Sequence, residues 1–317
     1  MWILRRAAFG VVVLFVVSLI IFGATQALPG DPARAILGRE ATPAFVAELN
    51  AQLNLNRPFV TQYTDWLTGV LSLDLGTSLA ARESVASLLG PRMVNSFVLM
   101  FLVAVIAIPL SIALGAITAI RRDRGLDRGT FIASLVLTAL PEFVTGLLLV
   151  LLLATSVFHV LPAVAAFPSG DLPMTHPREL ALPVLTLVLA IFPYLYRLVR
   201  ATMIDVLESD YISMARLKGM PERRVMLRHA LPNALVPVIQ GSALMLVYML
   251  GGIVVIEFLF AYPGLGTLLT DGVTNRDVPV IQGVALVLAA AVVLFNLLAD
   301  ALTVFVTPRL RTGAARR

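Results

Sequence analysis

The chain has 317 residues, of which 59% are hydrophobic and only 14% are charged, and its mean hydropathy is +0.92. Soluble domains carry about 25% charged residues, so this composition argues against a soluble globular protein and predicts a polytopic membrane protein. The absence of cysteine excludes disulfides and thiolate metal sites, and the net charge of +5 fits basic residues on one side of a membrane better than nucleic-acid binding.

The first predicted membrane span covers residues 7–28, which contain no charged residue and follow the basic pair Arg5 and Arg6. A helix needs about 20 apolar residues to cross about 30 Å of hydrocarbon. A secretory signal peptide has a shorter apolar core and a small-residue cleavage site. We therefore expect an uncleaved first span that begins in the cytoplasm.

Residues 29–93 form the longest polar region of the chain. Prolines at positions 43 and 58 each begin a predicted helix, because proline fits the first helical turn. The apolar residues of these helices, such as Tyr63 and Trp66, need a surface against which to pack. We expect a small helical subdomain on the outer face of the membrane rather than a long structureless loop.

Five further apolar runs predict five more spans. Their residue ranges are 94–120, 130–160 with an interruption at Pro141 and Glu142, 181–196, 234–256 and 280–299. A basic turn at residues 121–128 joins the second and third spans. Residues 257–279 contain prolines and glycines that predict a re-entrant or interfacial hairpin on the outer face.

The positions of the basic residues predict the orientation. With six spans and both termini inside, most of the 24 Lys and Arg residues fall in cytoplasmic segments, and the inverted topology would reverse this bias. The predicted fold is an all-α polytopic membrane protein with six transmembrane helices, cytoplasmic N and C termini, and a small helical extracytoplasmic subdomain between the first two helices. Its predicted parts are an N-terminal transmembrane helix (1–28), the subdomain (29–93), a transmembrane core (94–306) with a cytoplasmic loop (197–232), and a cytoplasmic tail (307–317).

The stretch that follows the fourth predicted span is the most highly charged segment of the chain. Its residues Tyr211, Met214, Ala215 and Lys218 fall at i, i+3, i+4 and i+7, which places them on one face of a helix. Gly219 then stands where a helix ends, because glycine adopts the left-handed conformation without a Cβ clash.

A second helix is predicted directly after this break. Pro221 fits its first turn, and Glu222 puts a negative charge near the positive end of the helix. Pro232 is expected to stop or kink it just before the next apolar run. From charge alone, such an amphipathic basic segment can also be interpreted as a loop that lies at the lipid headgroups.

The order of residues in this stretch favours a more specific interpretation. Ala215 and Gly219 are four apart, and Leu231 and Pro232 follow the glycine at the spacing found in the EAA loop of binding-protein-dependent ABC importer permeases. The stretch resembles most the dipeptide/oligopeptide and nickel branch, and in particular its B-type permease subunit. Ser213 and Met214 stand where the name of the loop would put Glu and Ala, but that branch often lacks the Glu.

In this family the loop is a coupling helix that docks into a groove on a separate ATPase subunit. The resemblance implies that the coupling residues are Tyr211, Ala215, Lys218, Gly219, Arg228, His229, Leu231 and Pro232.

Further fragments resemble the same branch along nearly the whole chain. They lie at residues 28–32, 57–67, 74–78, 257–266, 276–283 and 296–300. Two departures are Asn54, where the family often has Gly, and Thr307, where Asp is usual. The outer-face hairpin residues implied by the match are Glu257, Pro263, Gly264 and Gly266.

The resemblance implies a permease subunit and not an enzyme. A phosphate-binding loop ends in Gly-Lys-Ser/Thr, and the only lysine, Lys218, follows Leu217, so the chain carries no such loop. We expect no cofactor in this chain, with ATP and Mg bound by two partner ATPase subunits. The resemblance further implies that a homologous second permease forms the heterodimer and that an extracytoplasmic substrate-binding protein delivers di- or oligopeptides. The expected location is the bacterial or archaeal plasma membrane, with lipid as a partner and no nucleic acid.

Three alternatives remain open from the sequence. A nickel-chelate importer belongs to the same branch, and cargo selection lies largely with the binding protein. A stand-alone channel or secondary carrier needs several ionisable residues at mid-membrane depth, where only Glu142 stands clearly. An intramembrane enzyme needs a nucleophile and base or metal ligands at one depth, and the three histidines lie far apart in sequence.

Polar residues in the third span predict part of a translocation path. Ser134, Thr138, Glu142 and Thr145 are spaced by four, four and three residues, which puts them on one helical stripe. A carboxylate in hydrocarbon is costly, so Glu142 should face protein or a water-filled cavity. The alternative is that Glu142 lies near the outer headgroups or bonds another helix without touching cargo.

Overall fold

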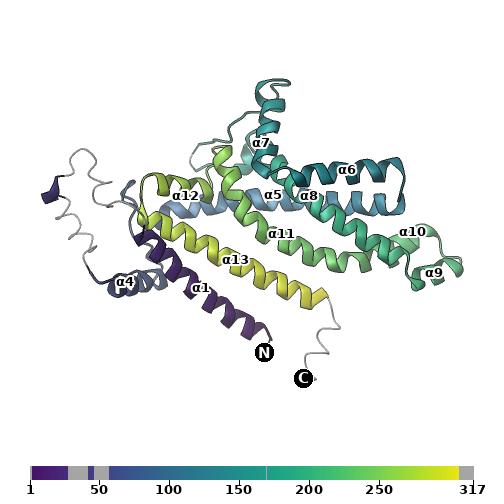
Figure 1. Cartoon of the computed structure of the whole chain (residues 1–317), viewed down its shortest axis with the longest axis horizontal. Helices are drawn as coiled ribbons and strands as arrows, with labels where there is room; N and C mark the ends of the chain where they lie inside the picture. Colours follow the sequence, from purple (N-terminus) through teal and green to yellow (C-terminus); the bar gives the residue numbers. More distant parts are fainter. Residues whose placement is uncertain (1, 28–41, 46–56, 169, 307–317) are drawn as a thin grey trace. The chain divides into compact units, whose positions relative to one another are not determined.

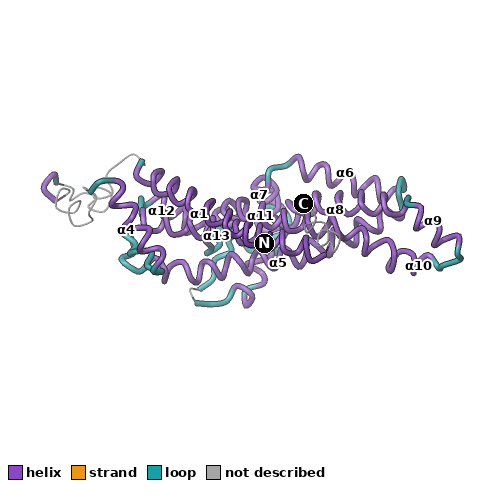
Figure 2. The backbone as a smooth tube through the Cα atoms, turned by 90° about the horizontal axis from the view of Figure 1, so that it is seen from below, coloured by secondary structure: helices purple, strands orange, loops and turns teal. Residues whose placement is uncertain are grey.

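The structure is a computed structural model that describes residues 2–27, 42–45, 57–168 and 170–306. Within these ranges the chain is helical and forms no strand, apart from an isolated bridge between Thr77 and Ser84 (Figure 2). The α-helices are α1 (Trp2–Gln26), α4 (Phe59–Leu71), α5 (Val85–Ile120), α6 (Gly125–Ala139), α7 (Glu142–Val150), α8 (Pro177–Leu207), α9 (Asp210–Leu217), α10 (Glu222–Arg224), α11 (Leu231–Leu259), α12 (Leu265–Thr274) and α13 (Val278–Val306). There are also two π-helical segments: η2 (Leu151–Thr155) extends α7, and η4 (Val225–Ala230) precedes α11.

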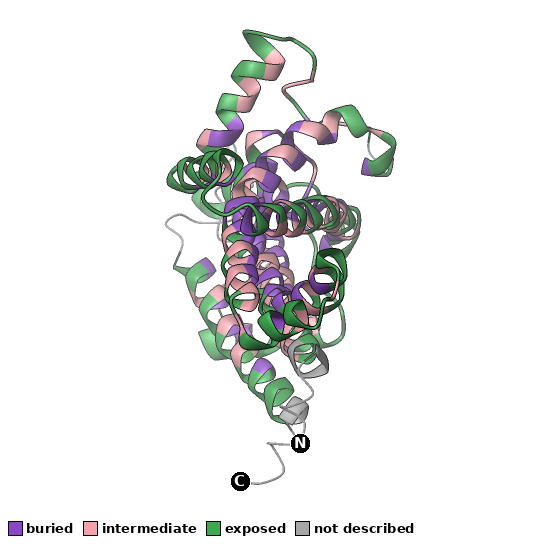
Figure 3. Ribbon diagram, turned by 90° about the vertical axis from the view of Figure 1, so that its right-hand side faces the viewer, coloured by how far each residue is buried: buried purple, intermediate pink, exposed green. Residues whose placement is uncertain are grey.

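Long apolar helices confirm the predicted all-α polytopic membrane protein. Among the described residues, five helices are long and apolar enough to cross a membrane, and the pair formed by α6 and by α7 with η2 makes a sixth if it is counted as one broken span. Many large apolar residues on these helices are exposed, as expected where lipid replaces water as the solvent. Exposed residues are drawn green in Figure 3.

The chain divides into two compact units. Unit 1 comprises Met1–Ser96 and Ala261–Val293, and unit 2 comprises Phe97–Phe260 and Leu294–Arg317. Helices α5 and α13 therefore contribute to both units. The predicted domain boundaries stay predictions, and residues 28–41, 46–56 and 307–317, which include the motif at 28–32, Asn54 and Thr307, lie outside the described residues.

In unit 1, an aromatic cluster joins α4 to α1. The ring of Phe22 in α1 lies 5.3 Å from Phe59, 5.5 Å from Tyr63 and 5.6 Å from Trp66, measured between ring centroids. The hydroxyls of Tyr63 and Ser18 are 2.9 Å apart and hydrogen-bonded. The helix predicted to begin at Pro58 is confirmed, and its apolar residues pack against the first span.

In unit 2, α8 lies beside α11, and α6 and α7 both pack on α8 (Figure 1). The predicted fourth span, 181–196, is too short, because α8 runs from Pro177 to Leu207. Its charged residue Arg200 does not end the helix, since the guanidinium Nε and Nη2 donate hydrogen bonds of 2.6 and 2.7 Å to the Asp127 carboxylate of α6. The predicted second span is also too short, since α5 begins at Val85.

The interruption predicted at Pro141 and Glu142 is a sharp bend. Helix α6 ends at Ala139 and α7 begins at Glu142, and the two axes meet at 104°. Figure 1 shows α7 turning away from the line of α6. Proline disfavours helical geometry in the residue before it and lacks an amide proton, so the break falls where the sequence predicts it.

Candidate functional site

The charged stretch after α8 forms two helical arms joined at Gly219. Helix α9 ends at Leu217, and Gly219 has φ +76°, a left-handed conformation that favours glycine. A Cβ at this position would meet no atom within 4 Å, so the requirement is one of backbone conformation and not of space. Pro221 then caps α10. The predicted helix break is confirmed.

The second arm continues into the membrane without interruption. Residues Glu222–Leu259 form one helix of 38 residues, made of α10, η4 and α11. Of the two outcomes predicted for Pro232, a stop is therefore wrong, and a kink stays a prediction. Proline removes one amide donor and its ring crowds the preceding turn. Here the wider π-helical turn of η4 lies directly before α11, so the helix accommodates Pro232 in the first turn of α11.

A buried apolar cluster fixes both arms to the ends of the long helices. We call residues 210–230, which comprise α9, the Gly219 turn, α10 and η4, the elbow. Ile212 of α9 is 0% exposed and packs with Val225 and Ala230 of η4. The same cluster contains Ala119 of α5, Met203 of α8 and Ala234 of α11. Burying a side chain such as Ile stabilises the packed state by about 1.5–3 kcal/mol, so the elbow is held as part of unit 2.

Polar contacts on the surface join α9 to α10 and η4. The Arg216 guanidinium of α9 donates hydrogen bonds of 2.7 and 3.2 Å to the two carboxylate oxygens of Glu222 in α10. This carboxylate raises the pKa of the Arg216 guanidinium. The Tyr211 hydroxyl donates a 3.3 Å hydrogen bond to the carbonyl oxygen of His229. An exposed ion pair contributes only about 0.2–1 kcal/mol to folding stability. These contacts therefore matter more for the angle between the two arms than for the stability of the elbow.

The outer surface of the elbow is apolar and basic. Leu217 is 82% exposed, and Tyr211, Met214 and Leu227 are also exposed. Of the predicted coupling residues, the exposed ones are Tyr211, Lys218, Gly219, Arg228 and Pro232, and the half-buried ones are Ala215, His229 and Leu231. A fixed elbow with exposed Tyr, Met and Leu side chains has the form of a docking surface for a protein.

Sequence reasoning missed three features of this surface. Ile212, the buried residue of α9 that packs in the cluster, was not singled out from the sequence. Met214 was placed on one face of a predicted helix but was not included among the coupling residues, and the structure shows that it is exposed. The pair Arg216 and Glu222 was also missed, because its six-residue separation has meaning only once the Gly219 turn folds the arms together.

The predicted path residues do not share one helical stripe. Ser134 and Thr138 lie on α6, whereas Glu142 and Thr145 lie on α7 beyond the 104° bend. The expectation that all four lie on one helical stripe is therefore wrong, because the helical repeat is broken between Ala139 and Glu142. The hydroxyls of Ser134 and Thr138 donate to carbonyl oxygens of their own helix, at 2.7 Å to Phe131 and 2.8 Å to Ser134.

Glu142 lies at the first turn of α7 and against α11. It is half-buried, and a Cβ on Gly252 would lie 2.5 Å from both of its carboxylate oxygens. The absence of a side chain at Gly252 thus leaves the room that this carboxylate occupies. Within the described residues, Glu142 has no hydrogen-bond or ion-pair partner. It is therefore an ionisable group that α7 holds against Gly252 of α11.

The predicted outer-face hairpin contains a helix. In unit 1, residues 261–264 form a turn, and α12 follows from Leu265 to Thr274. The Asn95 side-chain amide of α5 donates a 2.7 Å hydrogen bond to the Pro263 carbonyl, and the Gly264 amide donates to the Tyr262 carbonyl at 2.8 Å. The Gly266 carbonyl accepts from the Thr270 hydroxyl at 2.9 Å. Glu257 belongs to unit 2, where it is fully buried in α11.

Two family models match the chain. Residues 111–312 match the binding-protein-dependent transport system inner membrane component. Residues 1–114 match the N-terminal part of a binding-protein-dependent transport system membrane component. Together the two matches cover the elbow, the bend and the first span.

Relatives with the same length carry related names. The chain is 36% identical over 309 residues to a putative peptide transport system permease protein of Brucella abortus strain 2308, and the match covers 98% of each chain. It is 34% identical over 318 residues to an oligopeptide transport system permease protein of Bacillus subtilis, again covering 98% of each. It is 34% identical over 314 residues to a glutathione transport system permease protein of Escherichia coli O6:H1, with 98% of each chain covered. The chain therefore belongs to the family of binding-protein-dependent transport system inner membrane components, as an ABC transporter permease of the peptide type.

Proposed function

We propose that the chain forms one half of the transmembrane pathway of an ATP-driven importer of di- and oligopeptides. A homologous second permease supplies the other half, and a substrate-binding protein delivers the cargo from outside. The names of relatives at 34–36% identity over 98% of the chain support peptide cargo. These relatives are bacterial, which supports a bacterial inner membrane as the location.

The elbow carries the proposal. Two partner ATPase subunits bind ATP and Mg, and one of them docks on the exposed Tyr211, Met214 and Leu217 of this chain. The cluster around Ile212 ties α9 to α5, α8 and α11, so movement of a docked subunit is transmitted to three long helices. An apolar exposed surface on a rigid element is what such a coupling needs.

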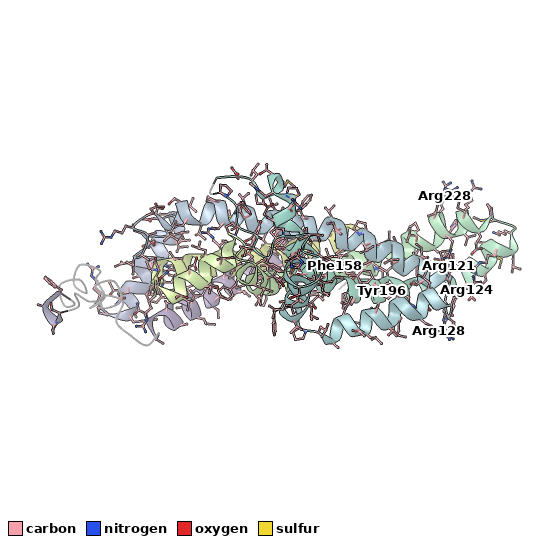
Figure 4. All side chains as sticks on the ribbon, turned by 90° about the horizontal axis from the view of Figure 1, so that it is seen from above. Arg121, Arg124, Arg128, Phe158, Tyr196 and Arg228 are labelled. Carbon is pink, nitrogen blue, oxygen red and sulfur yellow. The ribbon has the colours of Figure 1, made fainter. Side chains whose placement is uncertain are left out.

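We propose six spans with both termini in the cytoplasm. In Figure 4, the labelled residues Arg121, Arg124, Arg128 and Arg228 lie near one end of unit 2, where the elbow also lies. Basic residues concentrate on the cytoplasmic side of membrane proteins, which supports placing this end inside. The broken pair of α6 and α7 with η2 then counts as the third span.

The cargo assignment is tested by uptake into proteoliposomes that hold the complete transporter with its binding protein. We expect ATP-dependent uptake of a labelled di- or oligopeptide and peptide-stimulated ATP hydrolysis, since cargo delivery and ATP use are coupled. Nickel chelates serve as the competing cargo. Uptake of a nickel chelate without uptake of any peptide would assign the chain to the nickel alternative.

Gly219→Val should uncouple the transporter. Valine in the left-handed conformation costs on the order of 1–2 kcal/mol, so the turn would open and re-aim α9. We expect normal membrane insertion with at least a tenfold loss of peptide uptake and of peptide-stimulated ATP hydrolysis. Gly219→Asn is the matched control, because asparagine tolerates this conformation, and it should retain most activity. Wild-type uptake by Gly219→Val would show that the turn is not needed for coupling.

Glu142 is proposed to line the translocation path. A cysteine at this position should react with a small hydrophilic maleimide in at least one nucleotide state of the complex, because the carboxylate lies unpaired beside Gly252. Phe143→Cys, at an exposed apolar position of the same helix, is the control that should stay unreactive in lipid. Glu142→Leu should reduce peptide uptake severalfold with normal assembly. Normal uptake by Glu142→Leu, together with an unreactive Glu142→Cys in every state, would place this residue at a dry helix contact.

A further inference from the structure

Three arginines surround the turn between α5 and α6. Arg121, Arg124 and Arg128 are all exposed, and we call them the basic rim. Figure 4 shows them near the same end of unit 2. They belong neither to the elbow nor to the path around Glu142, so the proposed transport function leaves them unexplained.

The basic rim has no carboxylate partner within the described residues. The acidic residues nearest in sequence already face other guanidinium groups. Asp127 accepts both hydrogen bonds of Arg200. Arg122 lies 3.8 Å from Asp123 and 2.5 Å from Glu208. The three rim guanidinium groups therefore keep their donors and their positive charge available.

The buried Asp127 carboxylate holds the turn that carries the rim. Asp127 is 2% exposed, and its carboxylate accepts a 2.9 Å hydrogen bond from the backbone amide of Asp123, which has φ +63°. The Arg200 guanidinium that pairs with Asp127 also lies 5.3 Å from the centre of the Phe131 ring. Because the backbone is held, a ligand of the rim needs to order only the arginine side chains.

Exposed apolar side chains lie directly beside the rim. Ile120 at the end of α5, and Leu126 and Ile132 on α6, are exposed, the last of them at 60%. A guanidinium matches phosphate oxygens with two parallel hydrogen bonds, and exposed apolar residues on a membrane span face acyl chains. We propose that the basic rim binds the headgroup of an acidic phospholipid, whose acyl chains lie along Ile120 and Ile132. Exposed apolar residues at the ends of both helices favour lipid over an acidic protein partner.

The proposal is tested with the cysteine-free full-length chain reconstituted in nanodiscs. A fluorophore on Ile132→Cys reports contact with brominated acyl chains through quenching. Brominated phosphatidylglycerol should quench it at severalfold lower mole fraction than brominated phosphatidylcholine, since each basic residue near an anionic lipid is worth roughly fivefold in partitioning. Added salt should reduce this preference, because exposed charges are screened.

In the double variant Arg124→Gln/Arg128→Gln, the two brominated lipids should quench the fluorophore at nearly the same mole fraction. Arg223→Gln/Arg224→Gln removes the same charge from exposed elbow residues and should keep the preference. Equal quenching by both lipids in the chain with an intact rim would overturn the proposal. A loss of co-purifying ATPase subunits from the Arg124→Gln/Arg128→Gln variant, with no lipid preference before substitution, would identify the rim as a protein-docking surface instead.

Discussion

The packing of Ile212 against η4 and three long helices is the contact on which the proposed coupling depends. Without it, α9 would be a short polar helix with little to order it, since isolated helices of this length are unstable in water. With it, the side chains of Tyr211, Met214 and Leu217 stand on a base shared by α5, α8 and α11. The proposed coupling surface is thus packed directly on the long helices, which is why we propose that movement of a docked subunit reaches them.

A second constraint comes from the membrane, where backbone donors and acceptors must find partners within the protein. Unit 2 meets this constraint with a π-helical turn in one helix and with a very short break between two others. The π-helical turn of η4 carries the chain through Pro232, and Pro141 turns α6 into α7 across only two residues. The bend bears on the proposed path, because it places Glu142 at the start of a new helix against Gly252 of α11.

Much of this architecture follows from patterns visible in the sequence. The first span, the helix after Pro58, the break at Gly219 and the interruption at Pro141 rest on local chemistry, namely apolar length, proline and glycine. The failures concern contacts between distant residues. Helix α8 continues through Arg200 because this charge is paired with Asp127, which lies 73 positions earlier in the sequence. No local pattern shows that pairing. Similarly, a stripe drawn over residues 134–145 assumes a straight helix, and the angle of a proline break is set by what packs around it.

The most direct test of the central claim is a cross-linking measurement on the assembled transporter in membranes. The chain has no cysteine, so Leu217→Cys can carry a photoreactive maleimide at the most exposed apolar site of α9, and Leu71→Cys at the exposed end of α4 is its counterpart in unit 1. The account predicts that Leu217→Cys cross-links to an ATPase subunit and that Leu71→Cys does not. Cross-linking of the ATPase to Leu71→Cys, with none at Leu217→Cys, would contradict it.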